Sequence, residues 1–211
     1  MALSAPAPPR IDFPLRLHTP FSPKGRVACA THPYGDLDMT MTTAEIRIYV
    51  ACLAAYNDGI LHGVWIDAVQ QANDIWEEIS KMLAASPIPN AEEWAIHDYE
   101  GFQGLRLSEY EGLEAVAEKA AFIDVHGKLG AEIATYYGGD IDDARKALRE
   151  HYVGVYKSLS NFAEELTADT VEVPESLKHY IDYEAMGQDL AINDVIAIEL
   201  GFEEVHIFWH H

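Results

Sequence analysis

The sequence contains few cations. Its 211 residues include 14 Lys and Arg against 35 Asp and Glu, which gives a formal net charge of −21. A protein that binds nucleic acid directly needs Lys and Arg to displace counterions from the phosphates. The shortage of cations therefore argues against direct nucleic-acid binding. It favours a basic partner surface, and the commonest basic surfaces in a cell are those that hold nucleic acid.

Cysteines and long apolar runs are also scarce. The two cysteines, Cys29 and Cys52, are too few for a disulfide framework and are typical of a reducing cytosol. No run approaches the roughly 20 apolar residues that a membrane-spanning helix needs. The residues after Met1 lack the basic region and apolar run of a secretory signal. We therefore expect a cytoplasmic protein that does not bind membranes.

Apolar residues, in contrast, are plentiful. They make up 49% of the chain, which is enough to build a folded core, so the acidity does not indicate intrinsic disorder. A net charge this far from zero destabilises a compact sphere through self-repulsion. An elongated shape separates like charges and is therefore favoured.

The composition changes near residue 44. Residues 1–44 contain seven of the ten prolines, with four cations and three carboxylates, and show no sustained periodicity. Residues 45–211 carry ten cations and 32 carboxylates. We interpret residues 1–44 as either a mobile N-terminal extension or sequence upstream of a start at Met39 or Met41.

Residues 45–104 predict a three-stranded sheet with one helix. Two apolar runs, 48–56 and 60–66, flank an Asn-Asp-Gly sequence, as in a β-hairpin. Apolar residues at helical spacing over 75–83 are followed by two prolines that stop the helix. Residues 94–99 predict the third strand.

Residues 105–150 predict a small helical module. An apolar stripe at helical spacing covers 113–121, and two shorter helices are expected near 131–137 and 140–151. Asp140 is the expected N-cap of the last helix, because its carboxylate can accept a hydrogen bond from a free backbone N–H.

Residues 151–211 predict an α+β module. It begins with a strand over 152–156 and a helix over 159–166, and it closes with two strands over 195–200 and 205–209.

Pro174 suits the first turn of a further helix in this module. The buried side of that helix would carry Leu177, Ile181 and Met186. The predicted fold class is therefore α+β, as an elongated chain of three small modules.

Carboxylates occur in sustained clusters that contain few cations. A single cluster is usually a solvated surface, but surfaces that serve only solubility mix both signs. Helix neighbours three or four residues apart lie about 5–6 Å from each other. This is comparable to DNA, where each strand has one phosphate per roughly 3.4 Å of axis. We predict a partner-binding surface of phosphate-mimicking carboxylates formed by Asp74, Glu77, Glu78, Glu92, Glu93, Asp98, Glu100, Glu109, Glu111, Glu114, Glu118, Glu164, Glu165, Asp182, Glu184, Glu203 and Glu204.

A basic patch interrupts this acidic pattern. It comprises Arg145, Lys146 and Arg149. Pairing with Glu150 or other nearby carboxylates is the simpler explanation, and a contact to another subunit is the alternative.

The sequence gives no sign of catalysis. No His-Glu-x-x-His motif is present, and Gly138-Gly139 is not followed by the Lys-Ser/Thr of a phosphate-binding loop. Cys52 lies in an apolar run and is interpreted as a core residue. We therefore expect no enzymatic activity, no cofactor and no metal. The rival hypothesis is a small metalloenzyme built on Glu93, His97 and Asp98.

Four segments resemble the ArdA antirestriction proteins. They are YVACLAAYNDGILHGVWID at 49–67, EEWAIHDYEGF at 92–102, YIDYEAMG at 180–187 and GFEEVHIFW at 201–209. The resemblance covers about residues 45–211 in the same order and leaves the proline-rich segment outside it.

The resemblance implies an inhibitor of type I restriction–modification enzymes that is carried by mobile genetic elements. It would occupy the DNA groove of the DNA-specificity and methyltransferase core. The family fold is a curved chain of three modules that forms a homodimer through the third module. This implies a dimer interface that includes Tyr180, Ile181, Tyr183 and Met186. From composition alone, an acidic protein that targets another basic nucleic-acid-binding protein is the alternative.

Overall fold

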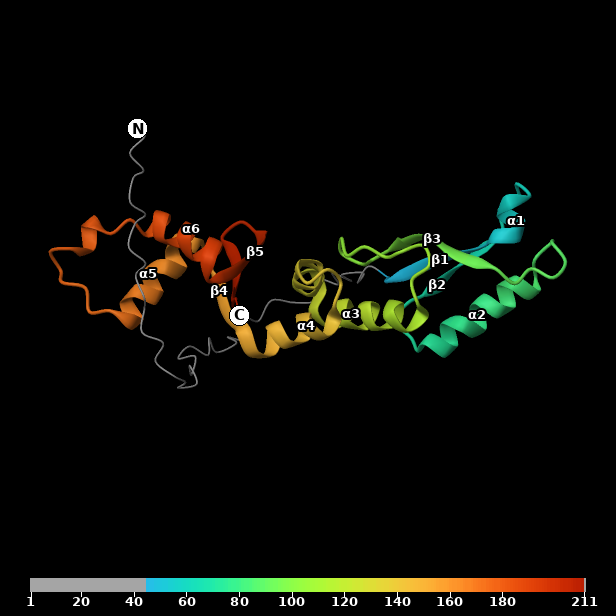
Figure 1. Ribbon diagram of the computed structural model, residues 1–211, viewed down its shortest axis with the longest axis horizontal. Helices are drawn as coiled ribbons and strands as arrows, with labels where there is room; N and C mark the ends of the chain where they lie inside the picture. Colours follow the sequence, from blue (N-terminus) through green and yellow to red (C-terminus); the bar gives the residue numbers. More distant parts are fainter. Residues whose placement is uncertain (1–44, 211) are drawn as a thin grey trace, which may run out of the picture. The chain divides into compact units, whose positions relative to one another are not determined.

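The computed structural model describes residues 45–210. Helices and two small antiparallel sheets make up this part of the chain (Figure 1), which confirms the predicted α+β class. Residues 1–44, the predicted extension, lie outside the described residues, as does Cys29. No helix of residues 45–210 is long and apolar enough to cross a membrane.

The first sheet has the strand order β2-β1-β3. β1 (Arg47–Cys52) pairs in antiparallel fashion with β2 (Gly63–Asp67) and with β3 (Trp94–Glu100). α2 (Ala72–Ala84) buries Ile75, Ile79 and Met82, as predicted, whereas Trp76 of the predicted stripe is exposed. The buried side chains of these elements include Ile48, Val50, Ile66, Ile75, Ile79 and Ile96.

The connection between β1 and β2 differs from the predicted hairpin. The first strand ends at Cys52, and the rest of the apolar run forms the short helix α1 (Leu53–Asn57). Two alanines favour a helical turn here, and periodicity alone does not distinguish a short apolar helix from a strand. The ring of His62 bonds the carbonyl oxygen of Met82 at 2.8 Å, which ties the connection to the end of α2.

The predicted helices near 113–121 and 131–137 belong to one element, α3 (Leu113–Tyr136). Gly127 interrupts it with φ 55° and ψ −142°, a conformation that strongly favours glycine. α4 (Ile141–Lys146) continues into the π-helical turn η1 (Ala147–His151). The predicted cap is confirmed, because Asp140 accepts a hydrogen bond from the Asp143 N–H at 3.0 Å.

The second sheet has the strand order β4-β6-β5. β4 (Tyr152–Tyr156), β5 (Val195–Gly201) and β6 (Glu204–Trp209) all pair in antiparallel fashion, close to the predicted bounds. α5 (Leu159–Thr170) and α6 (Tyr183–Asn193) pack against each other.

The helix predicted to begin at Pro174 is wrong. The 3-10 turn η2 (Lys178–Tyr180) occupies this stretch, and α6 begins only after Asp182. Asp182 accepts a hydrogen bond from the Ala185 N–H at 3.0 Å, and this N-cap sets the start of α6. Leu177, predicted to be buried, is therefore exposed.

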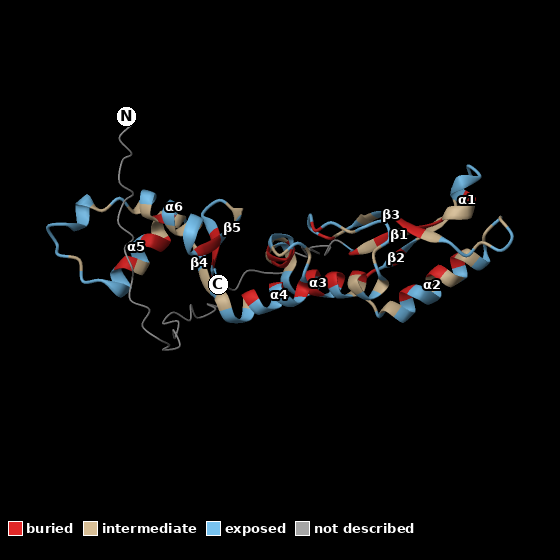
Figure 2. Ribbon diagram, viewed as in Figure 1, coloured by how far each residue is buried: buried red, intermediate tan, exposed pale blue. Residues whose placement is uncertain are grey.

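The core extends through most of the described chain. One connected cluster of buried side chains begins in β1 and α2, continues through α3 and α4, and includes Ile196, Ile198 and Phe208 of the second sheet (Figure 2). A smaller cluster around Phe162 fills the space between α5 and the second sheet. The division of residues 45–211 into three modules stays a prediction.

Candidate functional site

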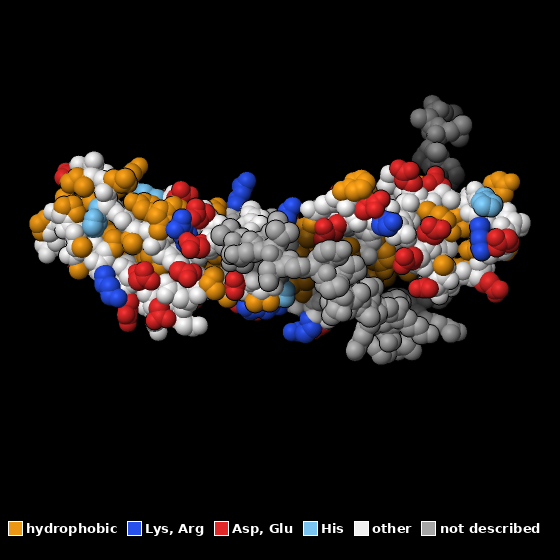
Figure 3. All heavy atoms as spheres, turned by 180° about the vertical axis from the view of Figure 1, so that it is seen from behind, with side chains coloured by type: hydrophobic (Ala, Val, Ile, Leu, Met, Phe, Trp, Pro, Cys, Tyr) orange, Lys and Arg blue, Asp and Glu red, His pale blue; other side chains and the backbone are white. Residues whose placement is uncertain are grey.

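The predicted phosphate-mimicking carboxylates lie largely at the surface. All are exposed except Glu78 and Glu111, which are half-buried. On the face shown in Figure 3, Asp and Glu side chains occur over both ends of the described chain, interspersed with hydrophobic side chains. The clusters of carboxylates differ in how many of their members have a Lys or Arg side chain beside them.

The α2 cluster is only weakly compensated. Glu77 lies 3.9 Å from Lys81 in an exposed pair, and such pairs contribute little. Glu78 accepts a hydrogen bond from the side-chain amide of Gln70 at 2.9 Å. Asp74 lies in the first turn, where its charge is favourable to the helix dipole. This helix therefore presents net negative charge to solvent.

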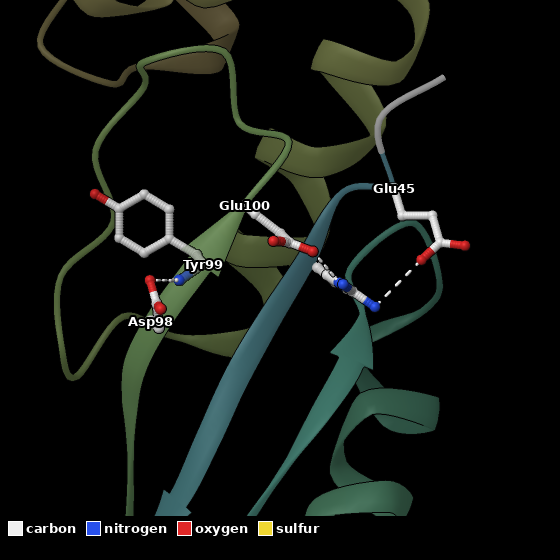
Figure 4. A network of polar contacts seen from close by, with 5 residues as sticks. Glu45, Asp98, Tyr99 and Glu100 are labelled. Carbon is white, nitrogen blue, oxygen red and sulfur yellow. Dashed lines mark hydrogen bonds and ion pairs between the residues drawn. The ribbon is translucent and has the colours of Figure 1, made fainter. Parts of the chain in front are cut away.

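The end of β3 contains a compensated and an uncompensated carboxylate. Arg47 bonds Glu100 across the sheet and Glu45 at 3.3 Å (Figure 4). The carboxylate of Asp98 instead accepts a hydrogen bond from the backbone N–H of Tyr99 at 2.8 Å. Glu100 thus has a cation beside it, whereas Asp98 forms no ion pair with a Lys or Arg of the described residues.

The half-buried Glu111 forms an ion pair with the buried Lys119. Its carboxylate lies 2.5 Å from the Lys119 ammonium, with side chains 16% and 10% exposed. Burial alone would raise the pKa of Glu111. Hydrogen bonds from Lys119 and from the Ser108 N–H, together with the Lys119 charge, outweigh burial and place the pKa of Glu111 below its usual value. Its role in partner binding stays a prediction, although its carboxylate is directed toward Lys119.

The two arginines of the basic patch pair with nearby carboxylates, as predicted, whereas Lys146 forms no ion pair with a carboxylate of the described residues. Arg145 bonds Glu118 at 2.6 Å and Asp142 at 3.4 Å, and Arg149 bonds Glu150 at 2.7 Å. The positive charges of these arginines offset part of the negative charge around α4. Glu114, one turn before Glu118 on α3, forms no ion pair with a Lys or Arg of residues 45–210.

The third group of carboxylates surrounds the second sheet. Glu164 and Glu165 are exposed neighbours on α5, and Glu184 lies in the first turn of α6. Asp182 is the N-cap of α6, Glu203 lies in the turn after β5, and Glu204 begins β6. Glu203 lies 3.9 Å from Lys157, and Glu204 lies 3.4 Å from the ring of His206.

The proposed metalloenzyme site does not assemble. The described residues contain no group of three or more His, Cys, Asp or Glu side chains placed to hold a metal ion. The ring of His97 packs edge-on against Tyr56, with centroids 4.7 Å apart, while Asp98 bonds the Tyr99 backbone. Cys52 is buried, as predicted.

The residues expected at a dimer interface differ in exposure. Tyr180 is 84% exposed, while Ile181, Tyr183 and Met186 are half-buried. Phe202, which was not predicted from the sequence, is 93% exposed at the β5–β6 turn. An aromatic residue directly after a turn glycine was the available signal.

Comparison with known proteins identifies the family. The family model described as antirestriction protein (ArdA) matches residues 48–204. The chain belongs to the ArdA family of antirestriction proteins. No curated protein sequence matches it. The ArdA match runs from β1 to the start of β6 and includes every predicted phosphate-mimicking carboxylate. An antirestriction protein acts against restriction enzymes.

Proposed function

We propose that this ArdA protein is a DNA mimic that occupies the DNA-binding groove of type I restriction–modification enzymes. One observation carries the proposal beyond the family assignment. Many exposed carboxylates form no ion pair with any Lys or Arg of the described chain. Those of the predicted set are Asp74, Glu92, Glu93, Asp98, Glu109, Glu114, Glu164, Glu165, Asp182, Glu184 and Glu204.

These carboxylates would contact the Lys and Arg side chains that otherwise hold DNA phosphates. Most protein–DNA hydrogen bonds are made to phosphate and sugar, and these contacts do not depend on base sequence. One mimic can therefore inhibit enzymes with different target sequences. The ion-paired carboxylates, such as Glu100 and Glu118, contribute less because Arg47 and Arg145 already neutralise them.

The mechanism is stoichiometric and needs neither catalysis nor a cofactor. The inhibitor binds the DNA-specificity and methyltransferase core in the cytoplasm, where the enzyme meets incoming DNA. We further propose that the protein acts as a homodimer and that Tyr180, Ile181, Tyr183 and Met186 lie in the dimer interface. A dimer would double the length of the acidic surface.

Displacement of DNA from the enzyme tests the proposal. A fluorescent duplex is bound to a purified type I methyltransferase core, and the protein is titrated in while anisotropy is followed. We expect near-stoichiometric release of the duplex. Stable ternary complexes of enzyme, duplex and protein would contradict groove occupancy and would favour a target elsewhere on the enzyme.

A further inference from the structure

A cavity of about 410 Å³ opens beside the start of β3. It is lined by two glutamates, Glu92 and Glu93, by the aromatic residues Trp94 and Tyr110, and by Leu53. Neither glutamate forms an ion pair with a Lys or Arg of residues 45–210. The cavity therefore combines uncompensated negative charge with aromatic surface.

Backbone hydrogen bonds hold the lining segments together. The Leu53 N–H donates to the carbonyl oxygen of Glu93 at 3.0 Å, which joins α1 to the segment that leads into β3. The Ile96 N–H donates to the carbonyl oxygen of Glu109 at 2.9 Å, which holds the segment before Tyr110 against β3. The two carboxylates and the two rings are thus carried by segments fixed to one sheet.

The opposite end of β3 shows which ligand suits this combination. There the Arg47 guanidinium bonds the carboxylates of Glu45 and Glu100 (Figure 4) and lies 5.0 Å from the centroid of the Trp65 ring. Two carboxylates and an indole therefore already bind a guanidinium on this sheet. The cavity is lined by residues of the same kinds, two glutamates, a tryptophan and a tyrosine, and no arginine lines it.

We infer that this cavity binds one arginine side chain of the restriction enzyme. A guanidinium group is planar, carries five N–H donors and stacks on aromatic rings, whereas the ammonium of lysine is compact and more strongly hydrated. The cavity should therefore prefer arginine over lysine. This inference rests on the proposed function. The cavity would be an anchoring site within the acidic surface, where a few residues contribute more binding energy than the surrounding carboxylates.

Titration of the full chain with N-acetyl-arginine amide tests the site. The readout is the NMR signal of the Trp94 indole N–H, assigned with a Trp94→Phe variant. N-acetyl-lysine amide and N-acetyl-citrulline amide serve as matched probes. We expect saturable shifts with the arginine probe, and binding about fivefold weaker or worse with the other two, as about 1 kcal/mol of cation–π and charge-assisted contact implies.

Variants locate the effect. Tyr110 is 68% exposed, so Tyr110→Ala leaves the fold intact, and we expect it to weaken arginine binding about fivefold. The double variant Glu92→Gln/Glu93→Gln should weaken it at least as much. Asp169→Asn/Glu172→Gln is the control, because it removes two exposed carboxylates that lie outside both the cavity lining and the predicted phosphate-mimicking set, and it should leave arginine binding unchanged.

Equal responses to arginine and citrulline, or arginine binding unchanged by Tyr110→Ala, would overturn the inference. The same variants in a DNA-displacement assay separate it from the proposed function. Displacement by wild-type protein without any response of Trp94 to the arginine probe would remove the site alone. Arginine binding in the cavity without DNA displacement would keep the site and remove groove occupancy.

Discussion

At the residue scale, the surroundings of each carboxylate decide whether it stabilises the fold or remains exposed for partner binding. Glu111 and Glu114 lie on the same stretch of sequence and both were predicted to face a partner. The half-buried Glu111 is held by the buried Lys119, whereas Glu114 is exposed without a described Lys or Arg partner. Stability and partner binding should therefore respond to different members of the acidic set.

Replacing Glu111 should reduce stability. Glu111→Gln leaves the buried Lys119 side chain without its counter-charge, and we expect a loss of about 1–3 kcal/mol in the free energy of unfolding at pH 7. Urea unfolding followed by circular dichroism measures it. Glu114→Gln is the matched control, with an expected change within about 0.5 kcal/mol. Equal effects of the two variants would contradict the structural role of the pair.

The same pair predicts a pH dependence. Because the folded-state pKa of Glu111 lies below its usual value, its contribution is fully present above the unfolded-state pKa of about 4.3. It is lost as pH falls through the lower folded-state pKa. The difference in unfolding free energy between wild type and Glu111→Gln should therefore shrink below about pH 4. A difference that stays constant down to pH 3 would show that the ionised pair is not its origin.

Which carboxylates are neutralised could not be predicted from sequence. Arg47 and Glu100 are separated by 53 residues, and Arg145 and Glu118 by 27, so these pairs exist only because the fold brings them together. The aromatic cavity beside β3 was missed for the same reason, because Tyr110 and Trp94 meet there from different segments. The local pairing of Arg149 with Glu150, in contrast, was predicted from adjacency.

At the element scale, the pairing of α5 with α6 depends on one glycine. A Cβ atom at Gly187 would lie 2.7 Å from the backbone carbon and oxygen of Leu159, so the two helices would have to separate. We expect Gly187→Ala to lower the melting temperature and to cost about 1–3 kcal/mol. Gln188→Ala, at the exposed neighbouring position, should be neutral. Equal stability of both variants would contradict this close packing.

The sequence predicted most strands and helices within a few residues of their bounds. Alternating and β-branched patterns located both sheets, because strands with one buried face leave a clear signal. It failed at the end of the first strand, where an apolar run is shared by β1 and α1. It also failed at Pro174, because a favourable first-turn residue does not compensate for the absence of a buried face, and Asp182 provides the true helix start.

At the scale of the whole molecule, inhibition should be distributed over many charges. We expect single replacements such as Glu164→Gln or Asp98→Asn to change the inhibitory concentration by less than about threefold, because exposed ionic contacts contribute little individually. Combining five such replacements should weaken inhibition by more than tenfold. Enzyme-binding measurements on the series test this. Complete loss from one of these replacements, in a folded protein, would contradict distributed mimicry.

Inhibition should also weaken with salt. Charges at an accessible surface are screened over about 10 Å at 0.1 M ionic strength. We therefore expect the dissociation constant of the complex to rise steadily with the NaCl concentration. The rise should be shallower for the variant that combines five carboxylate replacements. Isothermal titration calorimetry at several salt concentrations provides the slope. A salt-independent affinity would indicate an apolar interface in place of an ionic one.

The most direct test of groove occupancy is competition during the reaction itself. A purified type I restriction enzyme cleaves unmodified DNA with ATP, and the protein is titrated in at two DNA concentrations. Groove occupancy predicts inhibition at near-stoichiometric protein, with a half-inhibitory concentration that rises with the DNA concentration. Inhibition that is insensitive to the DNA concentration, or no inhibition at any ratio, would contradict it.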